Sequence, residues 1–152
     1  MTDDFEQRHG YPPGPNKVRP ADHDDQAAVR RLAQVSLATA DLVTFYESIG
    51  DVTWADVCNG YFVAPAEDVL LQLGEYGAVD VGADQKACGL VIGSNGGGQS
   101  YVAGPGGAVY LTRTASLDEP GLDRVADGLR QFLELLEQAL TRFVDTGEPG
   151  CL

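Results

Sequence analysis

The chain has 152 residues, and its 23 Asp and Glu against 10 Lys and Arg give a formal net charge of −13 with both histidines neutral. This acidity excludes a nucleic-acid binder, because neutralising phosphates requires a surplus of Lys and Arg. Hydrophobic residues make up 43% of the chain and charged residues 22%, which is typical of a globular protein. No run approaches the roughly 20 apolar residues of a membrane span, so we expect one domain with neither a nucleic-acid nor a membrane partner.

The chain begins with acidic residues and lacks the basic flank and apolar run of a secretory signal, so we expect a cytoplasmic protein. Cysteine usage agrees with a reducing compartment. Cys58, Cys88 and Cys151 are odd in number and contain no C-x-x-C spacing. The sequence therefore predicts neither a disulfide framework nor a zinc site, and it predicts an exposed thiol at Cys151.

Composition divides the chain into three parts. Residues 1–24 are rich in glycine and proline among scattered charges, which predicts a flexible N-terminal arm. Residues 25–146 have the hydrophobic periodicity of a single domain, and residues 147–152 form a C-terminal tail.

The domain is predicted to open with two helices. The first runs from Asp25 to about Ser36, with Asp24 or Asp25 as its N-cap, because apolar residues recur at spacings of four and three. The second begins after Thr39, a suitable N-cap, and ends at Gly50, with apolar residues at i, i+3, i+4 and i+7.

A strand and a third helix are predicted next. Val57–Val63 is rich in β-branched and aromatic residues, as strands are. Pro65 then opens a helix that ends before Gly74, since proline is tolerated in the first helical turn and two acidic residues complement the positive helix end. We expect residues 76–85 to form a loop.

Three strands and a long helix complete the domain. The strands are Cys88–Ser94, Gln99–Ala103 and Ala108–Thr114, and the glycine-rich separators between them are typical of hairpin turns. The helix covers Leu122–Phe143, where apolar residues keep three-and-four spacing for about six turns. Because no helix separates the last three strands, we predict an α+β fold: an antiparallel meander of about four strands with helices packed against it.

Several patterns could carry chemistry, and each has a plainer interpretation. The glycine-rich run 93–100 lacks the lysine of a phosphate loop and opens a strand, so we interpret it as a β-turn. His9 and His23 lie in the predicted arm, and the cluster 22–25 lacks the fixed geometry of a metal site. Carboxylate pairs are too numerous for spacing to single out a general acid and base. We therefore expect no enzymatic activity, no cofactor and no metal.

The charge distribution is the most informative feature. Between Arg31 and Lys86 the chain has no basic residue, while nine acidic residues fall in that interval. Such a block attracts a cationic partner, although an acidic surface can also serve solubility alone. Trp54, the only tryptophan, lies among these acids, where it is either an interface anchor or a core residue. The candidate partner-binding residues are Asp51, Trp54, Asp56, Glu67, Asp68, Glu75, Asp80 and Asp84.

Five short motifs follow one another along the chain: residues 41–50 (DLVTFYESIG), 59–62 (NGYF), 92–98 (IGSNGGG), 106–110 (GGAVY) and 132–133 (FL). In this order they resemble the SUKH superfamily, which includes the Smi/Knr fungal cell-wall regulators and many bacterial immunity proteins. The chain departs from the family at Gln99 and Gly104, where an acidic residue is common. If those acids contact a partner in the family, the partner of this chain is expected to differ.

The resemblance implies a SUKH-like α+β domain that is not an enzyme, commonly an immunity protein that silences a polymorphic toxin of the nuclease or deaminase type. Such a toxin needs a cationic cleft for phosphates, and an acidic protein can fill that cleft in place of nucleic acid. We expect a monomer or weak homodimer that binds a cognate basic toxin domain. The alternatives are an adaptor that binds an endogenous protein, as the fungal relatives do, and a small hydrolase built on the glycine-rich turn and carboxylates.

Overall fold

The computed structural model describes residues 6–7, 10, 12, 14–82, 87–118, 121–148 and 151–152 of the chain. Its strands are β1 (Asn16–Pro20), β2 (Ile49–Trp54), β3 (Tyr61–Val63), β4 (Val79–Asp80), β5 (Cys88–Asn95), β6 (Ser100–Ala103), β7 (Val109–Thr112) and β8 (Leu122–Ala126). Its helices are α2 (His23–Leu32), α3 (Ala40–Ser48), α4 (Ala66–Tyr76) and α5 (Leu129–Thr146).

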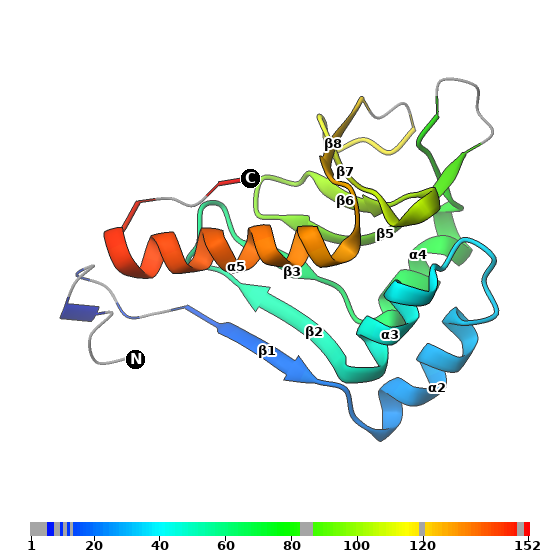
Figure 1. Cartoon of the computed structure of the whole chain (residues 1–152), viewed down its shortest axis with the longest axis horizontal. Helices are drawn as coiled ribbons and strands as arrows, with labels where there is room; N and C mark the ends of the chain where they lie inside the picture. The colour runs from blue at the N-terminus through cyan, green and yellow to red at the C-terminus, as the bar shows by residue number, and fades with distance from the viewer. Residues whose placement is uncertain are drawn as a thin grey trace.

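The strands form one antiparallel sheet of eight strands in the order β1-β2-β3-β5-β6-β7-β8, with β4 paired beside β5. Helix α5 lies across one face of this sheet, and α2, α3 and α4 gather together at one end of the molecule (Figure 1). The α+β class is therefore confirmed. The sheet is larger than the expected meander of about four strands, although β5, β6 and β7 are neighbours as predicted.

Part of the predicted flexible arm belongs to the sheet. Residues 16–20 form β1, which pairs with β2. Asp22 follows as the N-cap of α2, and its side chain accepts hydrogen bonds from the backbone N–H groups of Asp24 and Asp25 at 2.9 and 3.0 Å. The cap is thus Asp22 rather than Asp24 or Asp25. Arm residues 1–5, 8–9, 11 and 13 lie outside the described part of the chain.

Helix α3 has the predicted N-cap but ends early. The Oγ1 of Thr39 accepts a hydrogen bond from the Leu42 N–H at 3.3 Å. The helix stops at Ser48 instead of Gly50, because Ile49 already begins strand β2. Strand β2 is missing from the prediction since Ile49 also fits the apolar phase of the helix.

The predicted strand Val57–Val63 and the helix after it are shifted at their boundaries. Residues 57–60 form a turn closed by a hydrogen bond from the Gly60 N–H to the Val57 carbonyl at 2.8 Å, so β3 keeps only three residues. Helix α4 continues through Gly74 to Tyr76 and ends at Gly77, whose φ of 79° suits glycine.

The single long helix predicted from Leu122 is wrong in its first part. Leu122–Ala126 is strand β8, paired with β7, and α5 begins only at Leu129. Leu122 and Val125 keep the helical spacing of three, but the segment pairs with β7 instead, with Leu122 opposite Thr112 and Ala126 opposite Val109. The chain is extended at Gly128, which separates the strand from the helix.

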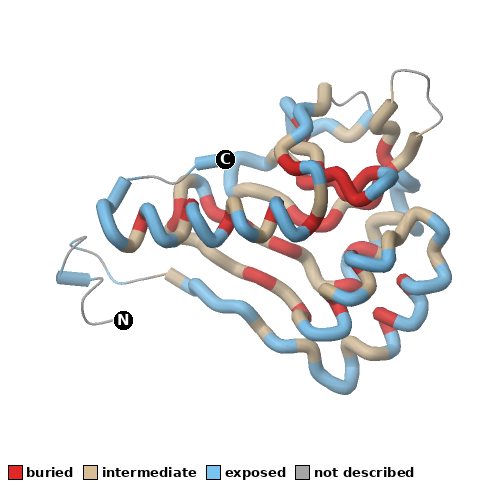
Figure 2. Tube along the Cα trace, viewed as in Figure 1, coloured by how far each residue is buried: buried red, intermediate tan, exposed pale blue. Residues whose placement is uncertain are grey.

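The core lies between the sheet and its helices (Figure 2). Tyr101 of β6 packs on Phe132 of α5, with ring centroids 4.9 Å apart. Tyr46 of α3 is buried and donates its hydroxyl to the Ala64 carbonyl at 2.8 Å, and burial raises the pKa of this hydroxyl above its ordinary range. Across the described ranges, every helix falls short of the length or the apolar character that a membrane crossing demands.

The cysteines contradict the prediction. Cys58, in the turn before β3, forms a disulfide with Cys151, and Cys88 remains free. An odd cysteine count leaves room for one bridge, and the 93-residue separation gives no local pattern that could have revealed it. The C-terminal tail is also tied to the sheet by the Leu152 N–H, which donates to the Tyr61 hydroxyl at 3.0 Å.

Candidate functional site

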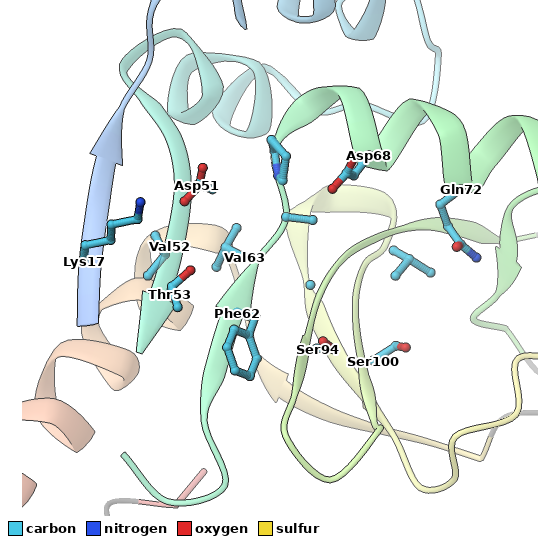
Figure 3. A pocket seen from close by; sticks show the side chains of 14 residues that line it. Lys17, Asp51, Val52, Thr53, Phe62, Val63, Asp68, Gln72, Ser94 and Ser100 are labelled. Carbon is cyan, nitrogen blue, oxygen red and sulfur yellow. The ribbon is translucent and has the colours of Figure 1, made fainter. Parts of the chain in front are cut away.

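A groove of about 550 Å³ crosses the sheet on the side away from α5 (Figure 3). Its floor is one row of side chains in register across five strands, from Lys17 of β1 through Thr53, Phe62 and Ser94 to Ser100 of β6. These side chains lie directly opposite one another on neighbouring strands, so they form a continuous strip.

The alternation of side chains along the strands explains why this face is open. Val52 and Val63 precede or follow the groove residues by one position and point into the core, as does Tyr101, which packs on α5. The groove residues therefore lie on the opposite face, where α4 provides one wall with Asp68 and Gln72. The result is a polar strip with an aromatic ring, Phe62, in its middle.

Gly93 allows the groove floor to form. A Cβ atom at this position would overlap the backbone carbonyl of Phe62 on the neighbouring strand. Backbone atoms cannot move aside as a flexible side chain can, so β3 and β5 reach this spacing only because residue 93 is glycine.

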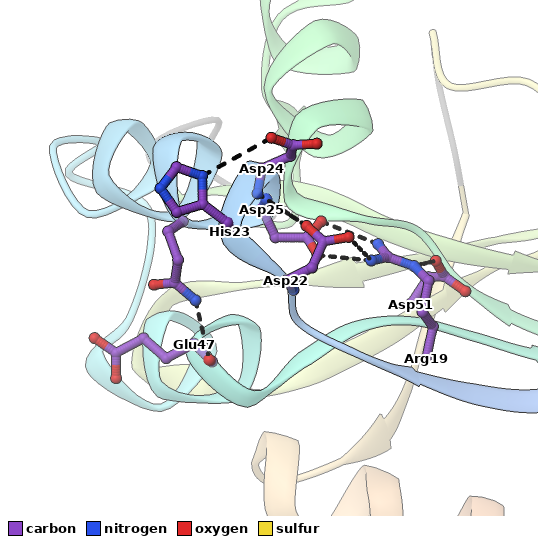
Figure 4. Close-up of polar contacts among 8 residues, drawn as sticks. Arg19, Asp22, His23, Asp24, Asp25, Glu47 and Asp51 are labelled. Atoms are coloured by element: carbon purple, nitrogen blue, oxygen red, sulfur yellow. Dashed lines mark hydrogen bonds and ion pairs between the residues drawn. The ribbon is translucent and has the colours of Figure 1, made fainter.

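Asp51 lies in the groove, and its charge is already compensated. Its Oδ2 accepts from the Arg19 Nε at 2.5 Å (Figure 4). The same guanidinium donates to both carboxylate oxygens of Asp25 at 2.7 and 3.0 Å and to Asp22 at 3.3 Å. These contacts lower the pKa of Asp25 to about 2, chiefly through the Arg19 hydrogen bonds, and raise that of Arg19.

Two further charged side chains line the groove and, unlike Asp51, are not compensated by an ion pair within the described residues. Lys17 projects from β1 at one side, and Asp68 projects from α4 at the other. Within the described ranges neither makes an ion pair. Lys17 and Asp68 are therefore the groove charges that remain available to a partner.

The predicted partner-binding residues are spread over the molecule, and of those within the described ranges only Asp51 and Asp68 line the groove. Trp54 is half-buried and packs against the core on the other face of the sheet. Asp56 accepts from the Gly14 N–H at 2.7 Å and from the Asn16 side chain at 2.5 Å, which fixes the start of β1.

The remaining predicted residues follow α4 and the loop after it. Glu67 is exposed and forms an ion pair with Arg31 of α2, while Glu75 is exposed near the end of α4. Asp80 accepts from the Gly82 N–H at 3.0 Å. Asp84 lies outside the described residues.

Of the acids that the structure describes in the block between Arg31 and Lys86, Asp51 and Glu67 thus have arginine partners. Arg19 and Arg31 precede that block in the sequence, but β1 pairing brings one to Asp51 and the packing of α2 on α4 brings the other to Glu67. Acidic side chains still dominate α3 and α4, which contain no Lys or Arg; these are Asp41, Glu47, Glu67, Asp68 and Glu75.

Most residues of the groove floor were outside the prediction, because only strand register shows that they share a face. The available signal was the alternation of Ser100 with Tyr101 and of Phe62 with its buried neighbours. The glycine-rich run 93–100 contains a turn, as predicted. In this turn Asn95 Oδ1 accepts hydrogen bonds from the Gly97 and Gln99 N–H groups at 3.0 and 3.1 Å. Within the described residues, no three His, Cys, Asp or Glu side chains lie together in a way that could hold a metal ion.

Compared with models of known protein families and with curated proteins, the sequence matches neither.

Proposed function

We propose that the protein is a non-enzymatic immunity protein of the SUKH type, which binds a basic nuclease or deaminase toxin domain and blocks its nucleic-acid cleft. The observation that supports this most is the position of the groove beside helix α4. The charged residues of α3 and α4 are all acidic, and the chain as a whole has a net charge of −13. A convex cationic edge of a toxin cleft fits an open groove of this kind better than a small enclosed substrate does.

The acidic side chains that can attract a toxin most strongly are those that do not already form an ion pair within the described part of the chain. A toxin Lys or Arg approaching Asp51 competes with Arg19, and one approaching Glu67 competes with Arg31. Asp68 and Glu75 are exposed, and within the described residues neither forms an ion pair. We therefore expect Asp68 and Glu75 to contribute most of the charge-dependent attraction, which weakens as salt rises.

Phe62 supplies the apolar part of the proposed interface. It is half-buried in the middle of the floor, with polar side chains on both sides (Figure 3). Aromatic residues near the centre of an interface commonly account for the largest losses on truncation. Lys17 on the opposite wall fixes the orientation, because the basic surface of the toxin must face α4 and not β1.

The test is binding to a toxin domain encoded beside the gene, measured by calorimetry at low and high ionic strength. The double variant Asp68→Asn/Glu75→Gln should weaken binding about 5- to 30-fold, and Phe62→Ala about 10-fold or more. The matched control is Glu134→Gln/Glu137→Gln, which removes two exposed acids from α5 on the other side of the sheet.

Two results would contradict the proposal. Affinity that does not change between low and high salt removes the electrostatic basis, and an equal loss in the α5 control removes α4 and the groove beside it as the binding surface. If the gene has no toxin-like neighbour and the groove variants instead lose an endogenous protein, the adaptor function replaces the immunity function.

A small hydrolase is the second candidate, because the groove contains two carboxylates in different surroundings. Asp51 is held by Arg19, whereas Asp68 is exposed. A pair of this kind could divide the roles of general base and acid. Hydrolysis of an ester or glycoside panel that is lost in Asp68→Asn would favour this candidate over the binding function.

A further inference from the structure

The disulfide between Cys58 and Cys151 joins the turn before β3 to the C-terminal end of the chain. We propose that it is a thiol–disulfide exchange site, at which a small thiol of the glutathione class releases the C-terminal tail from the sheet. This inference is independent of the proposed function.

The tail contacts the sheet at the β3 region. Helix α5 ends at Thr146, and Gly147 reverses the chain with a φ of 72°. Residues 151 and 152 are exposed and belong to no helix or strand. The bridge to Cys58 and the hydrogen bond from the Leu152 N–H to the Tyr61 hydroxyl join them to the β3 region. Once the bridge opens, the backbone at Leu152 is no longer held covalently near β3 and can exchange this hydrogen bond for water.

The backbone conformation of Cys58 is one that disfavours cysteine. Its φ is 54°, and among the described residues it is the only one other than glycine with a positive φ. The left-handed region favours glycine or asparagine, and Asn59 and Gly60 are next to it. A cysteine at this position is costly for the backbone, and reduction allows the turn to relax.

Exposure determines which sulfur is attacked. Cys151 is exposed and Cys58 is half-buried, so the incoming thiolate meets the Sγ of Cys151 first. The attack forms a mixed disulfide at Cys151 and breaks the protein bridge, and the Cys58 thiolate leaves and takes up a proton. A second small thiol attacks the mixed disulfide, frees Cys151 and leaves with the first as an oxidised small disulfide. Two small thiols are oxidised, and the protein gains two hydrogens.

Trp54 reports on this event. It lies directly opposite Tyr61 in the β2–β3 register and is the only tryptophan of the chain. Loss of the tail from the Tyr61 hydroxyl admits water at this end of the sheet. Tryptophan fluorescence therefore distinguishes tail release from changes at the Arg19 end, where no tryptophan lies.

The experiment uses the full chain purified without reductant. Thiol titration of the folded protein should find one free thiol, Cys88, and after treatment with millimolar glutathione all three cysteines should react. Reduction should shift the Trp54 emission to longer wavelength and speed hydrogen exchange at residues 57–61, while the far-ultraviolet circular dichroism stays unchanged. Cys151→Ser should reproduce the reduced state, and Cys88→Ser should retain the closed state.

Cys58→Gly provides a second open form that also suits the positive φ, so a folding failure of the serine variant does not decide the matter. Three free thiols before reduction would overturn the proposal, since the bridge would be absent. A bridge that survives glutathione in the folded protein, or a reduction that leaves Trp54 emission and exchange at 57–61 unchanged, would also overturn it.

Discussion

The two ends of the β1–β2–β3 part of the sheet are held by different chemistry. At one end Arg19 of β1 joins Asp51 of β2 and Asp25 of α2 through hydrogen-bonded ion pairs. At the other end Cys58, in the turn between β2 and β3, is bonded covalently to Cys151. Both ties join segments that are far apart in the sequence, yet one responds to pH and salt and the other to thiols.

This difference allows the two ends to be perturbed separately. The charges at the Arg19 end are partly shielded from water, because the side chains of Arg19 and Asp25 are 30% and 14% exposed. The bridge closes a separation of 93 residues, so most of its stabilisation comes from restricting the unfolded chain. A change in pH or salt should therefore weaken the Arg19 end without opening the bridge, and a thiol should open the bridge without breaking the ion pairs.

Removal of the bridge should have the largest effect. Closing a loop of this length is expected to contribute about 4–5 kcal/mol, so Cys151→Ser should lower the free energy of unfolding by up to that amount. Urea unfolding without reductant measures the change. Cys88→Ser is the control, since Cys88 is free. A loss as small as that of the control would show that the tail is held mainly by other contacts.

Removal of Arg19 should have the next largest effect. In Arg19→Met the carboxylates of Asp25 and Asp51 lose their partner while remaining partly shielded, which should cost about 2–3 kcal/mol. The double variant Arg19→Met/Asp25→Asn should recover part of this loss, because one unpaired charge is removed as well. If Asp25→Asn changes stability by the same amount in the original chain and in Arg19→Met, the two side chains are not coupled. Thiol titration should find the bridge intact in both.

Acid should weaken the same end without affecting the bridge. The Arg19 hydrogen bonds hold the pKa of Asp25 at about 2, below its ordinary value of 3.8. A carboxylate with a lowered pKa in the folded state stabilises the fold above its unfolded pKa, and this contribution is lost as the pH falls from about 4 to about 2. We expect a loss of about 1–2 kcal/mol over this window after allowance for solvent screening. Asp25→Asn should remove that part of the pH dependence, and an unchanged acid limb in this variant would contradict the assignment.

Elements with strong local signals could be predicted from the sequence. Thr39 marks the start of α3, Pro65 precedes α4, and the glycine-rich separators delimit β5, β6 and β7. Strands β1 and β8 could not be predicted, because both lie at sheet edges and are exposed or partly buried along most of their length, which leaves little alternation of apolar and polar residues. Val18, for example, is 45% exposed. The pairing of Cys58 with Cys151 depends on tertiary structure alone.

The groove residues divide in the same way, into those with a local signal in the sequence and those that depend on tertiary structure. Asp51 and Asp68 were predicted from charge, since a run of unbalanced acids is visible in the sequence. Phe62 and Ser94 were not, because they become neighbours only through the register of β3 and β5. The same lack of tertiary information concealed the arginine partner of Asp51, which comes from β1.

Arg113 sharpens the comparison, because its ion pair has more hydrogen bonds than the pair of Arg19 with Asp25 and should still have the smallest effect. It donates three to Asp123 at 3.1, 3.0 and 2.6 Å, but the two side chains are 64% and 57% exposed. Water competes for exposed charges and salt screens them, so Arg113→Met should leave the urea midpoint nearly unchanged. Comparing the stability losses of Arg113→Met and Arg19→Met separates the effect of the number of hydrogen bonds from the effect of their shielding from water. If the two variants lose equal stability, shielding is not what distinguishes the Arg19 end; if only Arg19→Met loses it, the stability of β1 pairing depends on charges that water reaches poorly.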